Sequence, residues 1–123
     1  MTKVVETEQL IAYVARKGAA RGHCVIFPKR HTPSLHDVED AVLAEMIVTI
    51  KELARAAEVS TYNVLQNNGA AAGQTAFHAH LHWIPRWSAS EGLHVDHDWP
   101  GGFDHSEIVK KIDWGLRRVS DGD

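Results

Sequence analysis

The sequence predicts an α+β fold in which an antiparallel sheet of about five strands is covered by one long helix and followed by a short C-terminal helix. Short segments rich in β-branched and aromatic residues recur between turn residues, which is typical of strands. Two other segments carry apolar residues at helical spacing. With 123 residues, 44% hydrophobic and 24% charged, the chain has the size and composition of one globular domain. We expect a single domain over residues 1–123, with its core at 4–86 and a C-terminal loop and helix at 87–123.

The first half of the sheet is predicted close to the N-terminus. Residues 3–6 and 9–14 have the composition of two strands separated by a short turn. A basic loop of small residues, 15–22, then leads to a third strand at 23–28.

A long amphipathic helix is predicted for residues 37–58. Asp37 is a suitable N-cap, and Asp40 lies in the first turn. Apolar residues recur at the spacing of one buried stripe, formed by Leu43, Met46, Ile47, Ile50, Leu53, Ala54 and Ala57. This helix should cover one face of the sheet.

The rest of the sheet and a C-terminal tail follow the helix. Residues 61–66 are β-rich, and a last strand should end at Pro85, because proline cannot donate to a ladder. Residues 91–105 form a loop rich in turn residues, and 106–119 form a short amphipathic helix. Tryptophans are available to pack this tail on the domain or on a second subunit, namely Trp87, Trp99 and Trp114.

Three histidines at every second position are the most informative feature of the chain: His78, His80 and His82. In a strand, they would share one face and send the alternate residues Phe77, Ala79, Leu81 and Trp83 to the core. A purely structural stripe is costly, because each ring needs hydrogen-bond partners and neighbouring cations repel each other. A zinc or copper site built from the three rings is the serious alternative.

A loop of small and amide residues comes directly before the histidines and contains Asn67, Gly73, Gln74 and Thr75. Backbone and amide donors from the last three residues, beside neutral imidazoles, suit phosphate oxygens better than a metal. Taken alone, the segment is equally explained as a plain turn.

Two sequence blocks resemble the histidine triad (HIT) family of nucleotide hydrolases and transferases. Residues 78–84, His-Ala-His-Leu-His-Trp-Ile, match the alternating His-apolar motif at every position. Residues 22–31, Gly-His-Cys-Val-Ile-Phe-Pro-Lys-Arg-His, resemble the second signature of the family. The resemblance runs from about Val4 to Arg86. It implies a HIT-like fold and a homodimer paired through the long helix and a strand.

The residues themselves support nucleophilic chemistry at phosphorus. A neutral imidazole is a competent nucleophile near pH 7, and a phosphorylated histidine is labile to water. His80 is flanked on both sides and is the candidate nucleophile, with His78 and His82 placed to bond phosphate oxygens or the leaving group.

The resemblance implies further roles around His80, which would carry a covalent nucleotidyl intermediate. His23 would pack against the triad and orient it, although it could equally be a satisfied histidine that begins a strand. Contacts to the phosphate or nearby groups are implied for Asn67, Gln74 and Thr75.

The sequence departs from the family pattern at several positions. The paired cysteines that hold a structural zinc in many members are missing, so His31 is not expected to bind zinc. Ala15 stands where an acidic or amide residue often bonds the ribose, and residues 18–21 replace the usual proline of the loop. The nucleotidyltransferase branches carry glutamine at the third histidine position. His82 is kept here, which favours hydrolysis over transfer.

Charge and composition limit the classes of partner that we expect the protein to bind. A net charge of −3 offers no basic surface for nucleic acid. No run approaches the roughly 18 apolar residues of a membrane span, so we expect neither nucleic acid nor a membrane as a partner. The N-terminus lacks the apolar core of a signal peptide and the lone Cys24 cannot form an intrachain disulfide, which indicates a cytoplasmic protein.

The leading hypothesis is a hydrolase that cleaves a dinucleoside polyphosphate or nucleoside phosphoramidate at its α-phosphorus through a nucleotidyl-His80 intermediate, without a metal or other cofactor. The alternatives are a metal-binding enzyme or sensor that uses the three histidines, and a nucleotide-binding module without turnover. His94 and His97 are open as metal ligands, substrate contacts or exposed loop residues.

Overall fold

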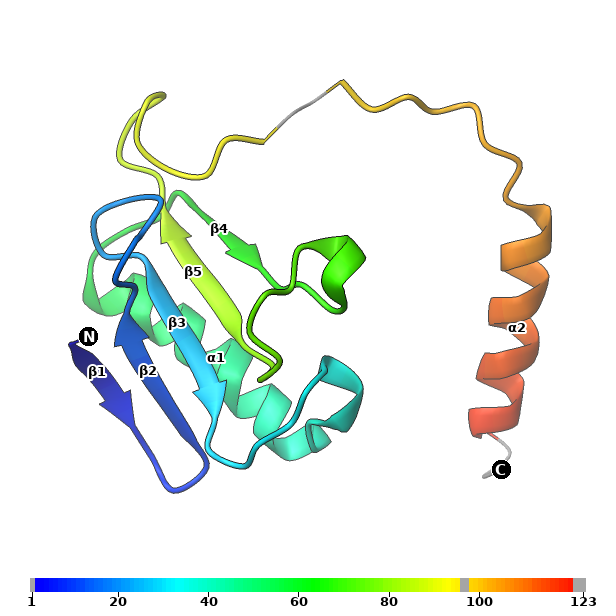
Figure 1. Cartoon of the computed structure of the whole chain (residues 1–123), viewed down its shortest axis with the longest axis horizontal. Helices are drawn as coiled ribbons and strands as arrows, with labels where there is room; N and C mark the ends of the chain where they lie inside the picture. Colours follow the sequence, from blue (N-terminus) through cyan, green and yellow to red (C-terminus); the bar gives the residue numbers. More distant parts are fainter. Residues whose placement is uncertain (1, 96–97, 121–123) are drawn as a thin grey trace.

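The computed structural model describes residues 2–95 and 98–120, and its described part contains one five-stranded antiparallel sheet (Figure 1). The strands are β1 (Lys3–Glu6), β2 (Leu10–Val14), β3 (Cys24–Pro28), β4 (Tyr62–Leu65) and β5 (Leu81–Pro85). They lie in the order β1-β2-β3-β5-β4. The helices are η1 (Leu35–Asp37), α1 (Asp40–Ala56), η2 (Ala70–Ala72) and α2 (Ser106–Ser120), of which η1 and η2 are 3₁₀ turns. The predicted fold class is confirmed.

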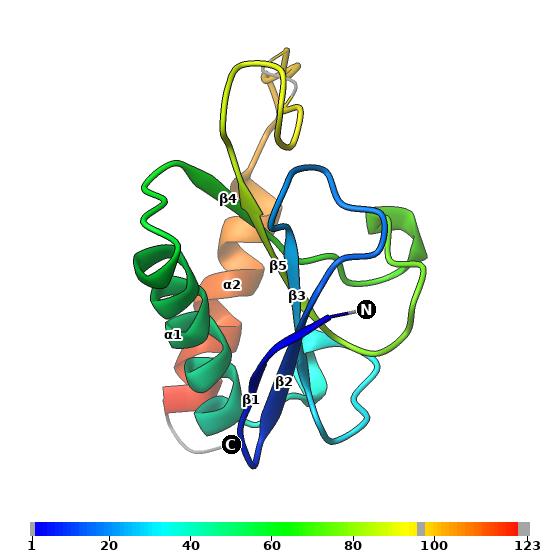
Figure 2. The same cartoon turned by 90° about the vertical axis from the view of Figure 1, so that its left-hand side faces the viewer.

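The core lies between the sheet and α1, which covers one face of it (Figure 2). Alternate residues of the strands point to this face, so that Ile26 of β3 and Trp83 of β5 are buried with Met46 and Ile50 of α1. The opposite face is left to loops, which makes it the face available for a site.

Helix α1 begins later than the sequence predicted. The Asp37 carboxylate accepts hydrogen bonds from the backbone N–H and the hydroxyl of Ser34, and so closes the 3₁₀ turn η1. It does not cap α1, whose N-cap is Glu39. The prediction of Asp37 as the N-cap was wrong because aspartate also favours such tight local turns.

The buried stripe of α1 is displaced from the predicted one, because it also includes Val42 and Thr49. Met46, Ile50 and Ala54 are buried, but Ile47 is 48% exposed, and Val48 next to it is 44% exposed. The C-terminal end of α1 is closed by Glu58, which adopts a φ of 56°. The next residue, Val59, donates its N–H to the Ala54 carbonyl oxygen at 2.9 Å, which satisfies a carbonyl of the last turn.

The tail leaves the rest of the molecule after β5. Helix α2 forms as predicted, but it stands apart from the sheet and α1 and contacts no other described element (Figure 1). Trp99 and Trp114 are 78% and 61% exposed, so within the described chain they do not pack the tail on the domain. Trp87 does, since its indole N–H donates to the Arg21 carbonyl oxygen at 2.8 Å.

The single cysteine is part of the core. Cys24 is 3% exposed, and its thiol donates to the Gly22 carbonyl oxygen. Burial raises the pKa of this thiol.

Candidate active site

The site lies where β5 pairs with β3 and β4, on the face of the sheet opposite α1. His82 pairs with Val25 of β3 and with Leu65 of β4. Its neighbours Leu81 and Trp83 are buried in the core, so strand alternation turns the His82 ring to the other face.

Residues 77–80, directly before β5, continue this alternation although they are not paired with a neighbouring strand. β5 begins at Leu81, so the predicted strand is shorter than expected, and Phe77 is 53% exposed instead of lying in the core. Ala79 keeps the pattern: it is buried, and its N–H donates to the Thr32 carbonyl oxygen at 2.6 Å. His78 and His80 on either side of it are half-buried. The ring centroids of His80 and His82 are 4.8 Å apart.

Phe27 belongs to the site although it is not among the residues predicted for it. Its ring centroid lies 5.3 Å from that of His78 and 5.1 Å from that of His80. Strand alternation was a usable signal, because Phe27 follows Val25 by two positions and must share its face. His31 packs edge-on against His78, with centroids 5.2 Å apart.

A hydrogen bond fixes which nitrogen of His80 carries the proton. Nδ1 lies 2.8 Å from the carbonyl oxygen of His78. Because a carbonyl oxygen can only accept, Nδ1 carries the hydrogen of the neutral ring and Nε2 keeps its lone pair. This is the tautomer that a nucleophilic imidazole needs.

The proton positions of His23 and His82 follow from one backbone N–H. Ala19 N–H donates to His23 Nδ1 at 2.9 Å. In the neutral ring the proton therefore lies on His23 Nε2, which is 2.9 Å from His82 Nδ1 and donates to it. His82 Nδ1 is thus an acceptor, and its Nε2–H is left to donate to a substrate. His23 is 7% exposed and lies beside the triad, as the resemblance implied.

His78 is held in a different way. Its Nε2 lies 2.8 Å from the Pro28 carbonyl oxygen, so it donates there and keeps its lone pair on Nδ1. Two triad rings are therefore oriented by backbone carbonyl groups, and the third by His23.

The surroundings favour uncharged imidazoles. Burial lowers the pKa of His82 to about 4, and the neighbouring His80 and His23 add to this shift. Burial also lowers the pKa of His23. Protonation of His82 at Nδ1 would place two N–H groups face to face unless the proton left His23 Nε2. The Ala19 N–H, which already donates to His23 Nδ1, opposes the transfer of that proton to Nδ1. At neutral pH, His82 and His23 are hydrogen-bonded neutral rings.

The loop before the triad is braced by its own amide side chains. The buried Gln74 accepts the Gly69 N–H at 2.7 Å and donates to the carbonyl oxygens of Pro33 and Ala76. Asn68 accepts the Leu35 N–H at 2.8 Å, which ties the loop to η1. The amide of Gln74 is thus engaged by the protein itself.

One prediction about this loop is wrong. The backbone N–H groups of Gly73 and Gln74 do not converge on an anion, because they donate to the carbonyl oxygens of Ala70 and Gly69 within the turn. Among the described residues, the carboxamide of Asn67 and the hydroxyl of Thr75 have no hydrogen-bond partner in the protein. The predicted contacts of these two residues with phosphate stay open to test.

The donor geometry gives no support to the three-histidine metal site. Within residues 2–95 and 98–120, no group of three or more His, Cys, Asp and Glu side chains is placed to hold one metal ion. His82 turns one nitrogen toward His23, and His78 and His80 each turn one toward a carbonyl oxygen. His94 is exposed, and His97 lies outside the described residues.

A surface clamp holds the loop that supplies the Ala19 N–H. The Glu91 carboxylate accepts both the backbone N–H and the Nε–H of Arg21, at 3.0 and 2.9 Å. The Arg21 guanidinium also lies over the Trp87 ring, 5.2 Å from its centroid. Gly18 permits a close approach in the same loop, because a Cβ there would lie 3.0 Å from His23 Cβ. The sequence carried no local signal for this clamp.

The lowered pKa of His82 predicts a pH-dependent stability. Between pH 6.5, the ordinary histidine value, and about 4, the unfolded chain binds more protons than the folded chain. The free energy of unfolding should therefore fall as the pH falls through this window, by roughly 1–2 kcal/mol because the ring is half-exposed. Urea unfolding at a series of pH values measures the slope, and NMR titration assigns it to His82. His105→Asn is the matched control. A His82 resonance that titrates near pH 6.5 would contradict the prediction.

Solved structures share this fold. A histidine triad nucleotide-binding protein from Candida albicans superposes with a TM-score of 0.81 at 29% identity, covering 98% of this chain and 90% of its own. A hypothetical protein from Leishmania major superposes with a TM-score of 0.84, also at 29% identity, covering 98% of this chain and 87% of its own.

Relatives with named activities are similar in sequence. Adenosine 5'-monophosphoramidase HNT1 of Saccharomyces cerevisiae is 39% identical over 119 residues, which cover 90% of this chain and 74% of the yeast protein. Adenylylsulfatase HINT3 of Arabidopsis thaliana is 36% identical over 88 residues, covering 68% of this chain and 45% of the plant protein.

The family model described as the HIT domain matches residues 1–89, which include the sheet, α1, His23 and the whole triad. The chain belongs to the HIT domain family.

Proposed function

We propose that this protein hydrolyses nucleoside phosphoramidates, and related nucleotides with a good leaving group, at the α-phosphorus through a covalent nucleotidyl-His80 intermediate. The observation that carries the proposal is the hydrogen bond from His80 Nδ1–H to the His78 carbonyl oxygen. It leaves Nε2 unprotonated, and the attacking lone pair does not have to be generated by a separate base.

The names of the two relatives support the substrate class. A monophosphoramidase acts on a nitrogen leaving group and an adenylylsulfatase on a sulfate leaving group. The part common to both names is the adenylyl group, so we infer a site that recognises the nucleotide and its α-phosphate and tolerates different leaving groups.

The proposed reaction has two steps. In the first, His80 Nε2 forms a bond to phosphorus while the bond to the leaving nitrogen breaks, and the departing amine takes a proton from water. His82 Nε2–H donates a hydrogen bond to the reacting group and stabilises its developing charge. In the second, water attacks phosphorus as the bond between phosphorus and His80 Nε2 breaks, which releases the nucleoside monophosphate and restores neutral His80. The proton released by this water neutralises the hydroxide ion left by the first step. Asn67 and Thr75 are proposed to donate to phosphate oxygens.

The protein is also proposed to form a homodimer. β4 is an edge strand, and its Val64, which is 44% exposed, lines the same shallow surface hollow as the exposed Ile47 and Val48 of α1. Together these three side chains form an apolar patch beside an unpaired strand edge, which native proteins normally cover.

Other features of the proposal concern partners and location. None of the described helices is both long and apolar enough to span a membrane. We propose a nucleotide as the partner, and no nucleic acid or membrane. The cytoplasmic location stays a prediction from the sequence.

Replacing the nucleophile should abolish turnover. His80→Asn is expected to lower kcat by about 10⁴-fold or more, because no other group can form the intermediate. Release of nucleoside monophosphate measures turnover, and mass spectrometry of acid-free quenched protein measures the adduct on His80. His105→Asn should leave both unchanged. Nucleotide binding with neither turnover nor adduct in the unaltered protein would favour the binding module instead.

Loosening the loop clamp should act through His23. Glu91→Gln keeps the shape of the side chain but weakens both bonds to Arg21, so kcat should fall about two- to fivefold with KM nearly unchanged, as fits an exposed ion pair. The His23 and His82 resonances should shift in the same variant. Glu107→Gln, on α2, is the control. A lower stability with unshifted resonances would show that Glu91 has only a structural role.

The apolar patch should control self-association. Val48→Gln combined with Val64→Gln is expected to raise the dimer dissociation constant at least about tenfold, because polar groups would replace buried apolar contacts. Sedimentation velocity over a concentration series measures it. Val4→Gln, which alters an equally exposed valine (43%) on the opposite edge strand, should have no effect. Equal shifts in both variants would place the interface elsewhere.

A further inference from the structure

The loop between β2 and β3 lies on the side of the sheet opposite α1, which is the side of the site (Figure 2). The first turn of this loop is held against His23 at both of its ends. Ala15 donates its N–H to the His23 carbonyl oxygen at 2.7 Å, and Ala19 donates its N–H to His23 Nδ1 at 2.9 Å. The turn therefore carries Arg16 and Lys17, which lie between these two contacts, beside the ring of His23.

Arg16 and Lys17 are exposed, and within the described chain their side chains form no ion pair or hydrogen bond. Three other basic residues from the segments around the site are each paired with a glutamate: Arg21 with Glu91, Lys29 with Glu6 and Arg30 with Glu39. The rings of His23 and His82 are neutral, so the positive charge beside them comes from Arg16 and Lys17. This charge is available to bind an anion.

An apolar floor lies next to the triad on the same face of the sheet. It is formed by side chains of β2 and β3, namely Ile11, Tyr13, Val25 and Phe27. Val25 pairs with His82 on one side and with Tyr13 on the other, so the floor extends from the triad toward β2. The faces of a nucleobase are apolar and stack on such side chains. A nucleotide with its α-phosphate at His80 can therefore lay its base on this floor.

The ribose of such a nucleotide would lie between the apolar floor and His80, and so close to the turn beside His23. The alternation of β2 continues to Ala15, whose methyl group shares the face of Tyr13 and cannot form a hydrogen bond. In dinucleotide sites, a carboxylate bonds the free ribose hydroxyl, whereas an arginine accommodates a phosphate at the same position. The turn offers the second kind of group, because Arg16 follows Ala15 directly.

We propose that the site selects nucleotides whose ribose carries a phosphate on its 2'- or 3'-oxygen, and that Arg16 and Lys17 bind this phosphate. The inference rests on the proposed function and names the substrate class of the same site. A guanidinium group and an ammonium group next to each other supply the charge-assisted hydrogen bonds that a phosphate dianion accepts. The contact lies outside the triad, so it raises affinity and leaves the chemistry at the α-phosphorus unchanged.

The binding of four adenosine ligands tests the inference without turnover. Calorimetry compares adenosine 5'-monophosphate with adenosine 3',5'-bisphosphate and adenosine 2',5'-bisphosphate. Adenosine 5'-diphosphate is the matched ligand, because it also has two phosphates but leaves the ribose hydroxyls free. At least one bisphosphate should bind about tenfold or more tightly than the monophosphate and the diphosphate, as fits hydrogen bonds between charged groups. The same phosphate added to the ribose of adenosine 5'-phosphoramidate should raise kcat/KM in the same direction.

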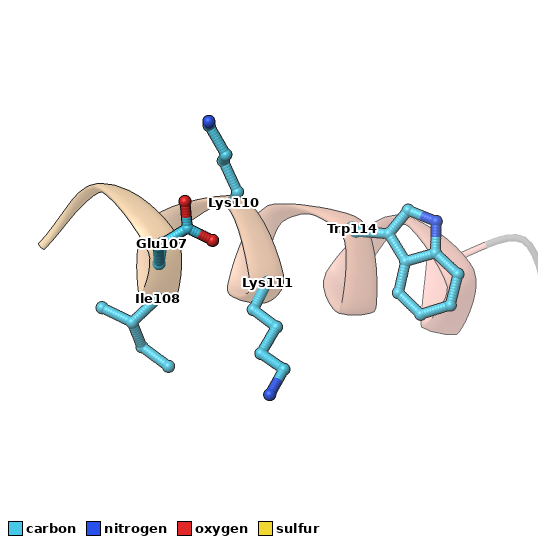
Figure 3. Close-up of a pocket in the computed structure, with 5 residues that line it drawn as sticks. All are labelled: Glu107, Ile108, Lys110, Lys111 and Trp114. Atoms are coloured by element: carbon cyan, nitrogen blue, oxygen red, sulfur yellow. The ribbon is translucent and has the colours of Figure 1, made fainter.

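Two doubly substituted full-length proteins test the assignment to the turn. In Arg16→Gln with Lys17→Gln, the preference for the bisphosphate should fall below about twofold, because the amides lack the charge that strengthens the contact. The control is Lys110→Gln with Lys111→Gln, which removes the same charge from α2. These two lysines line a surface hollow formed by residues of α2 alone (Figure 3), and α2 contacts no other described element. The control should keep the full preference.

Other outcomes overturn the inference. If both bisphosphates bind no more tightly than the monophosphate, the ribose phosphate is not recognised. If the diphosphate binds as tightly as the bisphosphates, or if both double variants lose the preference equally, general attraction of charge is the cause. A preference that survives Arg16→Gln with Lys17→Gln places the contact elsewhere.

The two proposals fail separately in this experiment. A preference for a bisphosphate without hydrolysis of any phosphoramidate would leave the ribose contact standing and remove the proposed hydrolysis. Hydrolysis without such a preference would leave the hydrolase standing and remove the ribose contact.

Discussion

The hydrogen bond from the Ala19 N–H to His23 Nδ1 is the constraint on which the site depends. A backbone amide cannot change its protonation state, so it sets the proton of His23 on Nε2, and this proton in turn makes His82 Nδ1 an acceptor. The backbone carbonyl of His78 fixes His80 in the complementary way. The directions of the donors and lone pairs are therefore established by the course of the main chain before any substrate binds.

This dependence explains why segments far from the triad contribute to it. The loop between β2 and β3 must bring Ala19 within 2.9 Å of His23, and small residues such as Gly18 make that approach possible. Arg21, in the same loop, is joined to Glu91 and Trp87, which follow β5. Two loops that are distant in sequence thus hold one imidazole at a fixed angle.

The sequence was sufficient to predict the fold class, most helices and strands, and the strand alternation that places the triad on one face. Apolar residues that recur at every second position indicate a strand, and those that recur at every third or fourth position indicate a helix. The ends of helices and strands were less predictable where the same residues could form either of two local structures. Asp37 closes η1 instead of capping α1, and β5 starts at Leu81 although the alternation begins earlier. Long-range partners such as Phe27 with the triad, or Arg21 with Glu91, need the sheet order, which one sequence does not specify. The amide groups of Gly73 and Gln74 were assigned to an anion because residue type alone does not reveal that the turn uses them internally.

The environment of Cys24 protects the single thiol of the protein from chemical modification. This thiol is adjacent in sequence to His23, yet it lies in the core, donates to a carbonyl oxygen and is held in its protonated form. Thiolates are the species that peroxides and alkylating reagents attack. The native chain thus carries no readily modified thiol beside the histidines of the site. A cysteine introduced on the surface could therefore receive a spectroscopic probe without a background reaction at position 24.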